Sequence, residues 1–306
     1  MTAQGEQIES ASRQRSKTLY MRLYKVPWWL MMYFGVLLWG VWRISSDGKL
    51  KQTYYYINDG IVTTISLALT SYGIALVIGL FVGAIRSQEP RPPDHATRFR
   101  QVVGRAIHAL AYNVTTFYVE FMRGMPPLVF LLVLGYGLIP AFRDVVNGQL
   151  LPILRDLLGK PNMADLSWTA RDPATAVAGL SFAYGAFLSE VFRAGIQSVE
   201  RGQIEAAKSL GMSYFQVMRF IVVPQAFRRI LPPLANDFIS MTKDTSLVTI
   251  LGTNDITMLA RKWASSSFRY MDTYGILALI YLYMTGTGSL ASKWLENYLK
   301  TDERES

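Results

Sequence analysis

The feature that most constrains this chain is a long apolar run, from Gly60 to Ile85, that contains no charged side chain. About 20 consecutive apolar residues are enough for a helix to cross a bilayer, so this run predicts a transmembrane helix. The chain is 51% hydrophobic and its mean hydropathy is +0.19, which is too apolar for an average soluble domain. We therefore expect an all-α, polytopic membrane protein.

About six segments of this kind are predicted to span the membrane: residues 28–44, 60–85, 127–142, 174–189, 238–252 and 274–290. Residues 106–123 are predicted to form a helical entry to the third span. Gly124, Pro126 and Pro127 separate this entry from the span, because proline interrupts a helix and glycine weakens it.

Glycines and turn residues indicate how some of these segments pack and connect. Gly79 and Gly83 form a GxxxG pair, which we expect to pack against another helix of the same chain rather than to form a dimer face. Asp47 and Gly48 predict a turn within a short polar connection, residues 45–59, after the first span.

The distribution of charge indicates the topology. The formal net charge is +9, and the basic residues lie mainly between apolar runs, notably in residues 86–105 and 201–229. Basic loops of membrane proteins face the cytoplasm. The mixed-charge loop 143–172 and the polar stretch 254–272 are then outward, and both termini are cytoplasmic. This placement is typical of membrane loops and not of a nucleic-acid-binding face.

Several kinds of catalytic and metal site are excluded by residue content. The chain has no cysteine and two histidines, so it can form neither disulfides nor thiolate metal sites. It contains no G-x-x-x-x-G-K-[ST] phosphate-binding loop, no H-E-x-x-H and no G-x-S-x-G. We expect no catalytic site, metal or cofactor within this chain.

A basic, polar stretch lies between the fourth and fifth spans and contains strong helix-boundary signals. A helix is predicted from Gln203 to Leu210, and Gly211 follows where a positive φ is needed. Ser213 and Gln216 have the spacing of a capping box for a second short helix. That helix runs through Phe215, Met218, Ile221 and Val222, and Pro224 is expected to interrupt it.

The two short helices are predicted to meet at an angle outside the bilayer. They would expose four consecutive residues: Glu205, Ala206, Ala207 and Lys208. Small alanine side chains beside charged ones suit close docking into a groove of another protein.

Charged and hydroxyl residues inside or beside the apolar segments are the candidate substrate path. They are Glu120, Arg123, Tyr184, Glu190, Lys243, Asp244, Thr245 and Ser246. Intramembrane charges are costly and face a partner or a wet cavity, so Lys243 and Asp244 either contact substrate or form an ion pair that holds the bundle together. Glu120 with Arg123, and Glu190 with Arg193, are three residues apart and can pair on one helix face.

The same residues resemble a known family. Glu205, Ala206, Ala207 and Gly211, followed by residues 221–224 (IVVP), resemble the E-A-A…G…I-x-x-P loop of bacterial ABC importer permeases, with Val223 where leucine is common. Residues 118–126 (YVEFMRGMP), 190–196 (EVFRAGI) and 243–247 (KDTSL) are similar to its polar amino-acid subgroup, the histidine, glutamate, glutamine and arginine type. The resemblance extends over about residues 60–299.

This resemblance implies a domain arrangement. Residues 60–299 would form the type I importer permease core, with the coupling loop at 198–235. Residues 27–59 would add an extra N-terminal helix and outer loop, and residues 1–26 and 300–306 would be cytoplasmic tails. Glu205, Ala206, Ala207, Lys208 and Gly211 would transmit motion from a separate ATPase.

The resemblance also implies partners and a location. The chain would sit in the bacterial inner membrane with a cytoplasmic ABC ATPase dimer, which would bind ATP and Mg. A second permease subunit, homologous or identical, and an extracytoplasmic amino-acid-binding protein would complete the importer. The alternative is a self-sufficient ion-coupled carrier that uses Glu190, Lys243 and Asp244, although we find no internal repeat typical of such carriers. A polytopic membrane enzyme is disfavoured by the missing catalytic motifs.

Overall fold

The structure is a computed structural model that describes residues 28–90 and 99–305. The predicted tail 1–26 lies outside the described residues, as does the centre of the loop 86–105. The chain divides between Tyr54 and Tyr55 into two compact units. All regular elements in the described ranges are helices, which confirms the all-α class.

The first unit contains helix α2 (Trp28–Ser46) and the start of helix α3 (Gly48–Asn58). Asp47 lies between them, and its Oδ1 accepts a hydrogen bond from the Lys49 amide at 2.8 Å. The turn at Asp47 is therefore confirmed. Most of the polar connection predicted for residues 45–59 is helical, because this cap begins a new helix.

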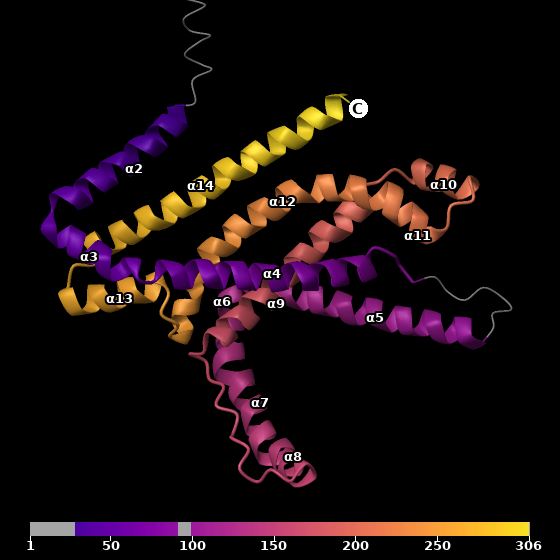
Figure 1. Ribbon diagram of the computed structural model, residues 1–306, viewed down its shortest axis with the longest axis horizontal. Helices are drawn as coiled ribbons and strands as arrows, with labels where there is room; N and C mark the ends of the chain where they lie inside the picture. Colours follow the sequence, from indigo (N-terminus) through magenta and orange to yellow (C-terminus); the bar gives the residue numbers. More distant parts are fainter. Residues whose placement is uncertain (1–27, 91–98, 306) are drawn as a thin grey trace, which may run out of the picture. The chain divides into compact units, whose positions relative to one another are not determined.

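The second unit contains the rest of the helices (Figure 1). In chain order they are α4 (Ile61–Arg86), α5 (Phe99–Gly124), α6 (Pro127–Leu132), η1 (Val133–Leu138), α7 (Ile139–Val145), η2 (Val146–Leu150), α8 (Leu151–Leu158), α9 (Pro173–Gln197), α10 (Arg201–Ser209), α11 (Tyr214–Val217), η3 (Met218–Val222), α12 (Val223–Asp244), η4 (Thr245–Leu251), α13 (Ile256–Ser267) and α14 (Tyr270–Glu305).

Four helical stretches of the described chain are long and apolar enough to cross a membrane: Gly48–Arg86, Pro127–Leu158, Pro173–Gln197 and Tyr270–Leu299. They include four of the six predicted spans. Residues 28–44 form helix α2 but are not among these stretches. Residues 238–252 are divided, because α12 ends at Asp244 and the short 3-10 helix η4 follows.

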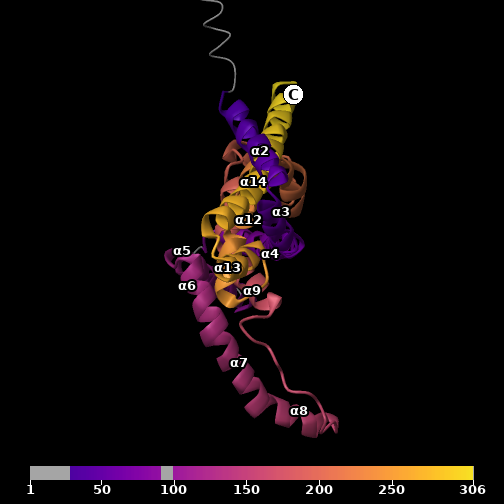
Figure 2. The ribbon, with the colours of Figure 1, turned by 90° about the vertical axis from the view of Figure 1, so that its left-hand side faces the viewer.

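The outward loop predicted for residues 143–172 is wrong in its first half, which continues the third span. Figure 2 shows α6, α7 and α8 following one another as a bent rod. Pro140 and Pro152 lie just after the π-helical turns η1 and η2, where the hydrogen-bonding pattern changes and a missing N–H is tolerated. The rod ends at Gly159, whose φ of +61° is left-handed.

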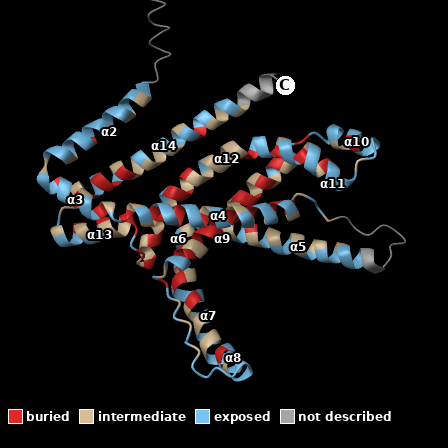
Figure 3. Ribbon diagram, in the orientation of Figure 1, coloured by how far each residue is buried: buried red, intermediate tan, exposed pale blue. Residues whose placement is uncertain are grey.

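The core of the second unit forms where α4 packs against α9 (Figure 3). A Cβ at Gly79 would lie 2.7 Å from the Leu188 Cβ, and one at Gly83 would lie 2.6 Å from the Ser189 carbonyl oxygen. The two helices therefore approach closely because these positions lack side chains. The prediction that the GxxxG pair packs within the chain is confirmed.

We expect Gly83→Ala to destabilise the protein, because the added methyl group would collide with backbone and not with a movable side chain. Overpacking of this kind costs about 1–3 kcal/mol. Gly73→Ala, in the same helix with open space around it, is the matched control. Thermal melting of the detergent-solubilised protein is the measurement, and equal melting temperatures for both variants would contradict the close packing.

Candidate coupling surface and translocation path

The coupling segment, residues 201–222, has the local structure that its sequence predicts. Helix α10 is followed by Gly211 with φ of +82°, which confirms the expected turn. The Ser213 amide donates to the Gln216 Oε1 at 2.7 Å, and the Gln216 amide donates to the Ser213 Oγ at 3.4 Å. The predicted capping box is therefore present at the start of α11.

Pro224 does not interrupt the second helix, so that prediction is wrong. The chain passes from α11 through the π-helical turn η3 directly into α12. Pro224 directly follows this π-helical turn, where the backbone hydrogen-bonding pattern changes and the N–H that proline lacks is tolerated. The coupling segment is thus continuous with a long helix of the bundle.

The exposure of the four predicted surface residues is confirmed for three of them. Glu205, Ala206 and Lys208 are exposed. Ala207 is only 3% exposed and belongs to a small core with Val217 and Val222, so its predicted exposure is wrong. The small side chain of Ala207 lets α10 pack against the following helix, while its two neighbours face outward.

The exposed surface of the same segment also carries large apolar side chains, which are not among the four residues predicted to be exposed. Leu210 is 84% exposed, and Tyr214 and Phe215 are also exposed. Contiguous exposed apolar residues beside charged ones are typical of a protein interaction site.

The opposite side of the coupling segment is attached to the bundle. Ile196 of α9 packs against the small core that contains Ala207. The Gln225 Nε2 of α12 donates to the Gln203 Oε1 of α10 at 2.7 Å. Just outside the segment, the Arg229 guanidinium of α12 donates to the carbonyl oxygen of Ser198, the residue that follows α9. A displacement of α10 would therefore act on both α9 and α12.

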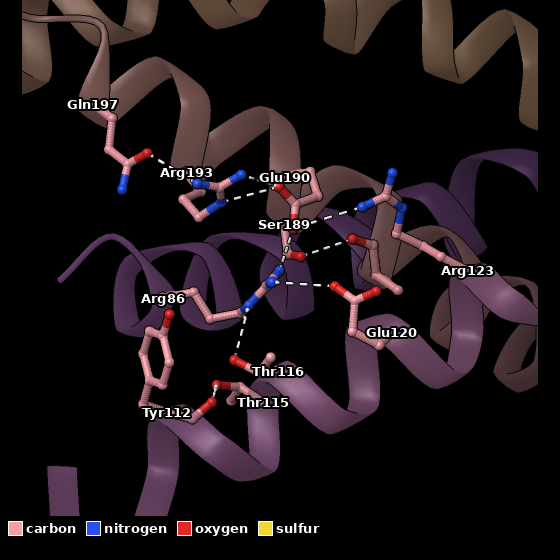
Figure 4. A network of polar contacts seen from close by, with 11 residues as sticks. Arg86, Tyr112, Thr115, Thr116, Glu120, Arg123, Ser189, Glu190, Arg193 and Gln197 are labelled. Atoms are coloured by element: carbon pink, nitrogen blue, oxygen red, sulfur yellow. Dashed lines mark hydrogen bonds and ion pairs between the residues drawn. The ribbon is translucent and has the colours of Figure 1, made fainter. Parts of the chain in front are cut away.

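A network of charged residues joins α4, α5 and α9 (Figure 4). Arg86, with 9% of its side chain exposed, forms an ion pair with Glu190. The Arg193 Nη2 lies 2.6 Å from the second carboxylate oxygen of Glu190, which confirms that predicted pair. Glu120 and Arg123 were expected to pair with each other. The structure instead places Glu120 3.7 Å from Arg86, and Arg123 3.9 Å from Glu190.

From the sequence, Arg86 is predicted to be the first residue of a cytoplasmic loop. The structure buries it at the end of α4, where it also donates from its Nε to the Thr116 Oγ1 at 3.3 Å. The available signal was its position as the single charge that ends a long apolar run.

The candidate path residues near the end of α12 differ in burial and in their partners. The buried Tyr184 of α9 donates from its hydroxyl to the Asp244 Oδ2 at 2.8 Å, so these two predicted residues meet. Thr245 is buried and donates to the Thr242 carbonyl oxygen at 2.8 Å, and Ser246 is half-buried. Lys243 is exposed, and no acidic partner for it lies within 4.0 Å in the described part of the chain.

Asp237 is a further carboxylate beside this path that the sequence analysis missed. It is half-buried and lies seven residues before Asp244, which places both on the same side of α12. The seven-residue spacing was the signal that could have revealed it.

The chain matches known transport proteins over most of its length. Residues 102–304 match the family model "Binding-protein-dependent transport system inner membrane component". The octopine transport system permease protein OccM of Rhizobium radiobacter is 32% identical over 233 residues, which are 76% of this chain and 81% of that protein. The arginine transport system permease protein ArtQ of Bacillus subtilis (strain 168) is 27% identical, over 81% of this chain and 94% of that protein.

A solved structure shows the same fold. A chain in the crystal structure of an amino acid ABC transporter with histidines superimposes with a TM-score of 0.62 and 28% identity. The match covers 82% of this chain and 97% of that chain. The all-helical bundle is therefore that of a transport permease subunit, and the chain belongs to the family of inner membrane components of binding-protein-dependent transport systems.

Proposed function

We propose that this chain is the permease subunit of an ATP-driven ABC importer for polar or charged amino acids. The similar proteins named above transport octopine or arginine or belong to an amino acid ABC transporter. The observation that carries the proposal is the coupling segment, which has an exposed outer face and an inner side attached to two helices of the bundle.

The outer face of this segment would dock into a cytoplasmic ABC ATPase dimer, which binds ATP and Mg. Glu205, Ala206 and Lys208 would contact the ATPase together with the apolar Leu210 and Phe215. Gly211 would keep the turn that orients α10, and Ala207 would hold α10 against α11. Motion of the ATPase would then reach α9 and α12 through the inner contacts.

The substrate path would pass the polar end of α12. Asp244, oriented by Tyr184, presents a carboxylate that suits the ammonium group of an amino acid, and Asp237 adds a second one. Thr245 and Ser246 would border this path, and Lys243 would be available to a substrate carboxylate. Glu120, Arg123 and Glu190 would act through the charge network of Figure 4, at the cytoplasmic end of the path.

The assembly would follow the organisation of the family. A second permease chain, homologous or identical, would complete the pathway, and an extracytoplasmic binding protein would deliver the amino acid. Residues 60–299 would form the permease core, with residues 27–59 added in front of it. Both termini would be cytoplasmic, on the same side of the inner membrane as the coupling segment.

Reconstitution into proteoliposomes tests this proposal. The chain is combined with its ATPase and binding protein, and uptake of labelled amino acids is measured with each component omitted in turn. Uptake should require ATP and all components. Uptake by the permease chain alone, driven by an ion gradient, would instead establish the self-sufficient carrier.

We expect Tyr184→Phe to raise the KM for the transported amino acid, because the Asp244 carboxylate would lose the hydrogen-bond donor that orients it. A hydrogen bond to a charged group is worth about 1.5–3 kcal/mol, which corresponds to roughly a tenfold rise in KM or more. Tyr283→Phe, at an exposed tyrosine of α14, is the control. Uptake kinetics should show a change in KM only for Tyr184→Phe. Equal KM values for the two variants would show that Tyr184 is not part of the substrate path.

A further inference from the structure

A cavity of about 1120 Å³ lies at the end of α9 that is remote from the coupling segment. Pro173, the first residue of α9, lines it, whereas the coupling segment follows the last residue of that helix. The 25 residues of α9 separate the two ends by about 37 Å, which is enough to cross a bilayer. With the coupling segment in the cytoplasm, this cavity opens on the outer side, and we name it the outer vestibule.

The charge of the outer vestibule has one sign. Arg171, Arg261 and Lys262 line it, and its lining residues in the described chain include no aspartate or glutamate. Clustered charges of one sign in a concave surface raise the local concentration of the opposite charge. The vestibule therefore attracts anions and repels cations.

A buried hydroxyl in the wall needs a partner. Thr253 is only 3% exposed and lines the outer vestibule. Its Oγ1 has no hydrogen-bond partner among the described residues. A buried polar group without a partner is unfavourable. This hydroxyl is enclosed in the wall, so a ligand acceptor would satisfy it only after the Thr253 side chain turns toward the cavity.

The wall that carries the cations is held in place. Asp255 accepts hydrogen bonds from the amides of Thr257 at 3.1 Å and Met258 at 2.9 Å, and so caps α13, the helix of Arg261 and Lys262. Burial raises the pKa of the Asp255 carboxyl. The Lys262 Nζ donates to the Asn254 Oδ1 at 2.6 Å, which fixes the lysine at the rim.

Glycine at position 252 brings the third cation close to the wall. Its φ is +83°, and a Cβ there would lie 3.3 Å from the Cγ of Arg171. The stem of Arg171 therefore lies directly over the backbone that precedes Thr253. The vestibule combines cations from two separate parts of the chain with an unsatisfied hydroxyl in its wall.

Helix η4 lies between the outer vestibule and the candidate substrate path at the end of α12. Thr249 and Leu251 of η4 line the vestibule, and Asp244 directly precedes this helix. Seven residues of 3-10 helix rise by about 14 Å, so an amino acid would occupy the two sites in succession.

We infer that the outer vestibule is a carboxylate-binding site and that its ligand is an amino acid of net negative charge, handed over before it reaches Asp244. The inference rests on the proposed function and adds a substrate class to it. Arg171, Arg261 and Lys262 bind the carboxylates, and Thr253 donates its hydroxyl hydrogen. A dibasic amino acid gains one favourable carboxylate contact and suffers repulsion of its side chain.

Uptake kinetics of the complete importer in proteoliposomes test the inference, with L-glutamate, L-glutamine and L-arginine as probes. L-Glutamate should be the preferred substrate, and Arg261→Gln should raise its KM by about tenfold. Thr253→Val should raise the KM in the same direction and Thr253→Ser should restore it. Arg143→Gln, at a cation outside the vestibule that pairs with Asp144, should leave the KM unchanged.

The outcomes separate the inference from the proposed function. Uptake that prefers L-arginine or L-glutamine, or equal KM values for Arg261→Gln and Arg143→Gln, would overturn the vestibule as a carboxylate site and leave the importer intact. Failure of the complete wild-type complex to take up any amino acid with ATP would overturn the proposed function itself.

Discussion

Gly211→Val in the coupling segment is expected to lower ATP-driven uptake by about tenfold or more, while the protein still inserts and binds its ATPase. Gly211 has φ of +82°, a conformation that costs an L-residue roughly 1–2 kcal/mol and a β-branched one more. The substitution would therefore shift the turn between α10 and α11. The exposed face of α10 would then change its orientation relative to the contacts that attach the segment to α9 and α12.

The measurement for Gly211→Val is the ratio of amino acid taken up to ATP hydrolysed in proteoliposomes. Gly202→Val is the matched control, because Gly202 lies in α10 with a negative φ and open space around it. Glu205→Ala should lower the same ratio by removing an exposed charge of the docking face. A normal ratio for Gly211→Val would show that this turn does not transmit the motion.

Glu190→Ala is expected to cause the largest loss of stability among single substitutions in the charge network. Its carboxylate is 21% exposed and is shared by Arg86, Arg123 and Arg193. Its removal leaves the buried Arg86 guanidinium beside two other cations. Breaking a buried pair in this way costs about 3–5 kcal/mol, because the buried charge of Arg86 then faces only the exposed Glu120 carboxylate.

Glu120→Ala is the matched control for Glu190→Ala. The Glu120 side chain is 66% exposed and lies 3.7 Å from the same arginine. An exposed ion pair contributes about 0–1 kcal/mol, so this variant should melt near the wild-type temperature. Thermal melting in detergent compares the two variants. Equal melting temperatures would show that Glu190 does not hold α4, α5 and α9 together.

Features of the coupling segment that depend on neighbouring residues could be predicted from the sequence. The turn at Gly211 and the capping box of Ser213 follow from local backbone and hydrogen-bond rules. The burial of Ala207 could not be predicted, because it depends on how α10 folds back onto Val217 and Val222. The predicted interruption at Pro224 is wrong because the π-helical turn η3 precedes this proline and the helix continues through it.

The candidate site shows the same limit at longer range. Charges in apolar runs identified Glu190 and Asp244, because such charges are costly without a partner. Their partners Arg86 and Tyr184 come from helices 104 and 60 residues away in the chain, and sequence spacing contains no information on that pairing. Spacing predicted the pair Glu190–Arg193 on one helix, yet it also suggested Glu120–Arg123, which the structure replaces with contacts between helices.

Site-directed labelling tests most directly whether the coupling segment is the cytoplasmic contact for a separate ATPase. The chain has no native cysteine, so Ala206→Cys creates a unique thiol on an exposed residue, and Ala207→Cys provides a buried control. A membrane-impermeant maleimide should label Ala206→Cys in inside-out vesicles, and assembly with the ATPase should block that labelling. Labelling of Ala206→Cys from outside intact cells, or labelling that the ATPase leaves unchanged, would contradict this role.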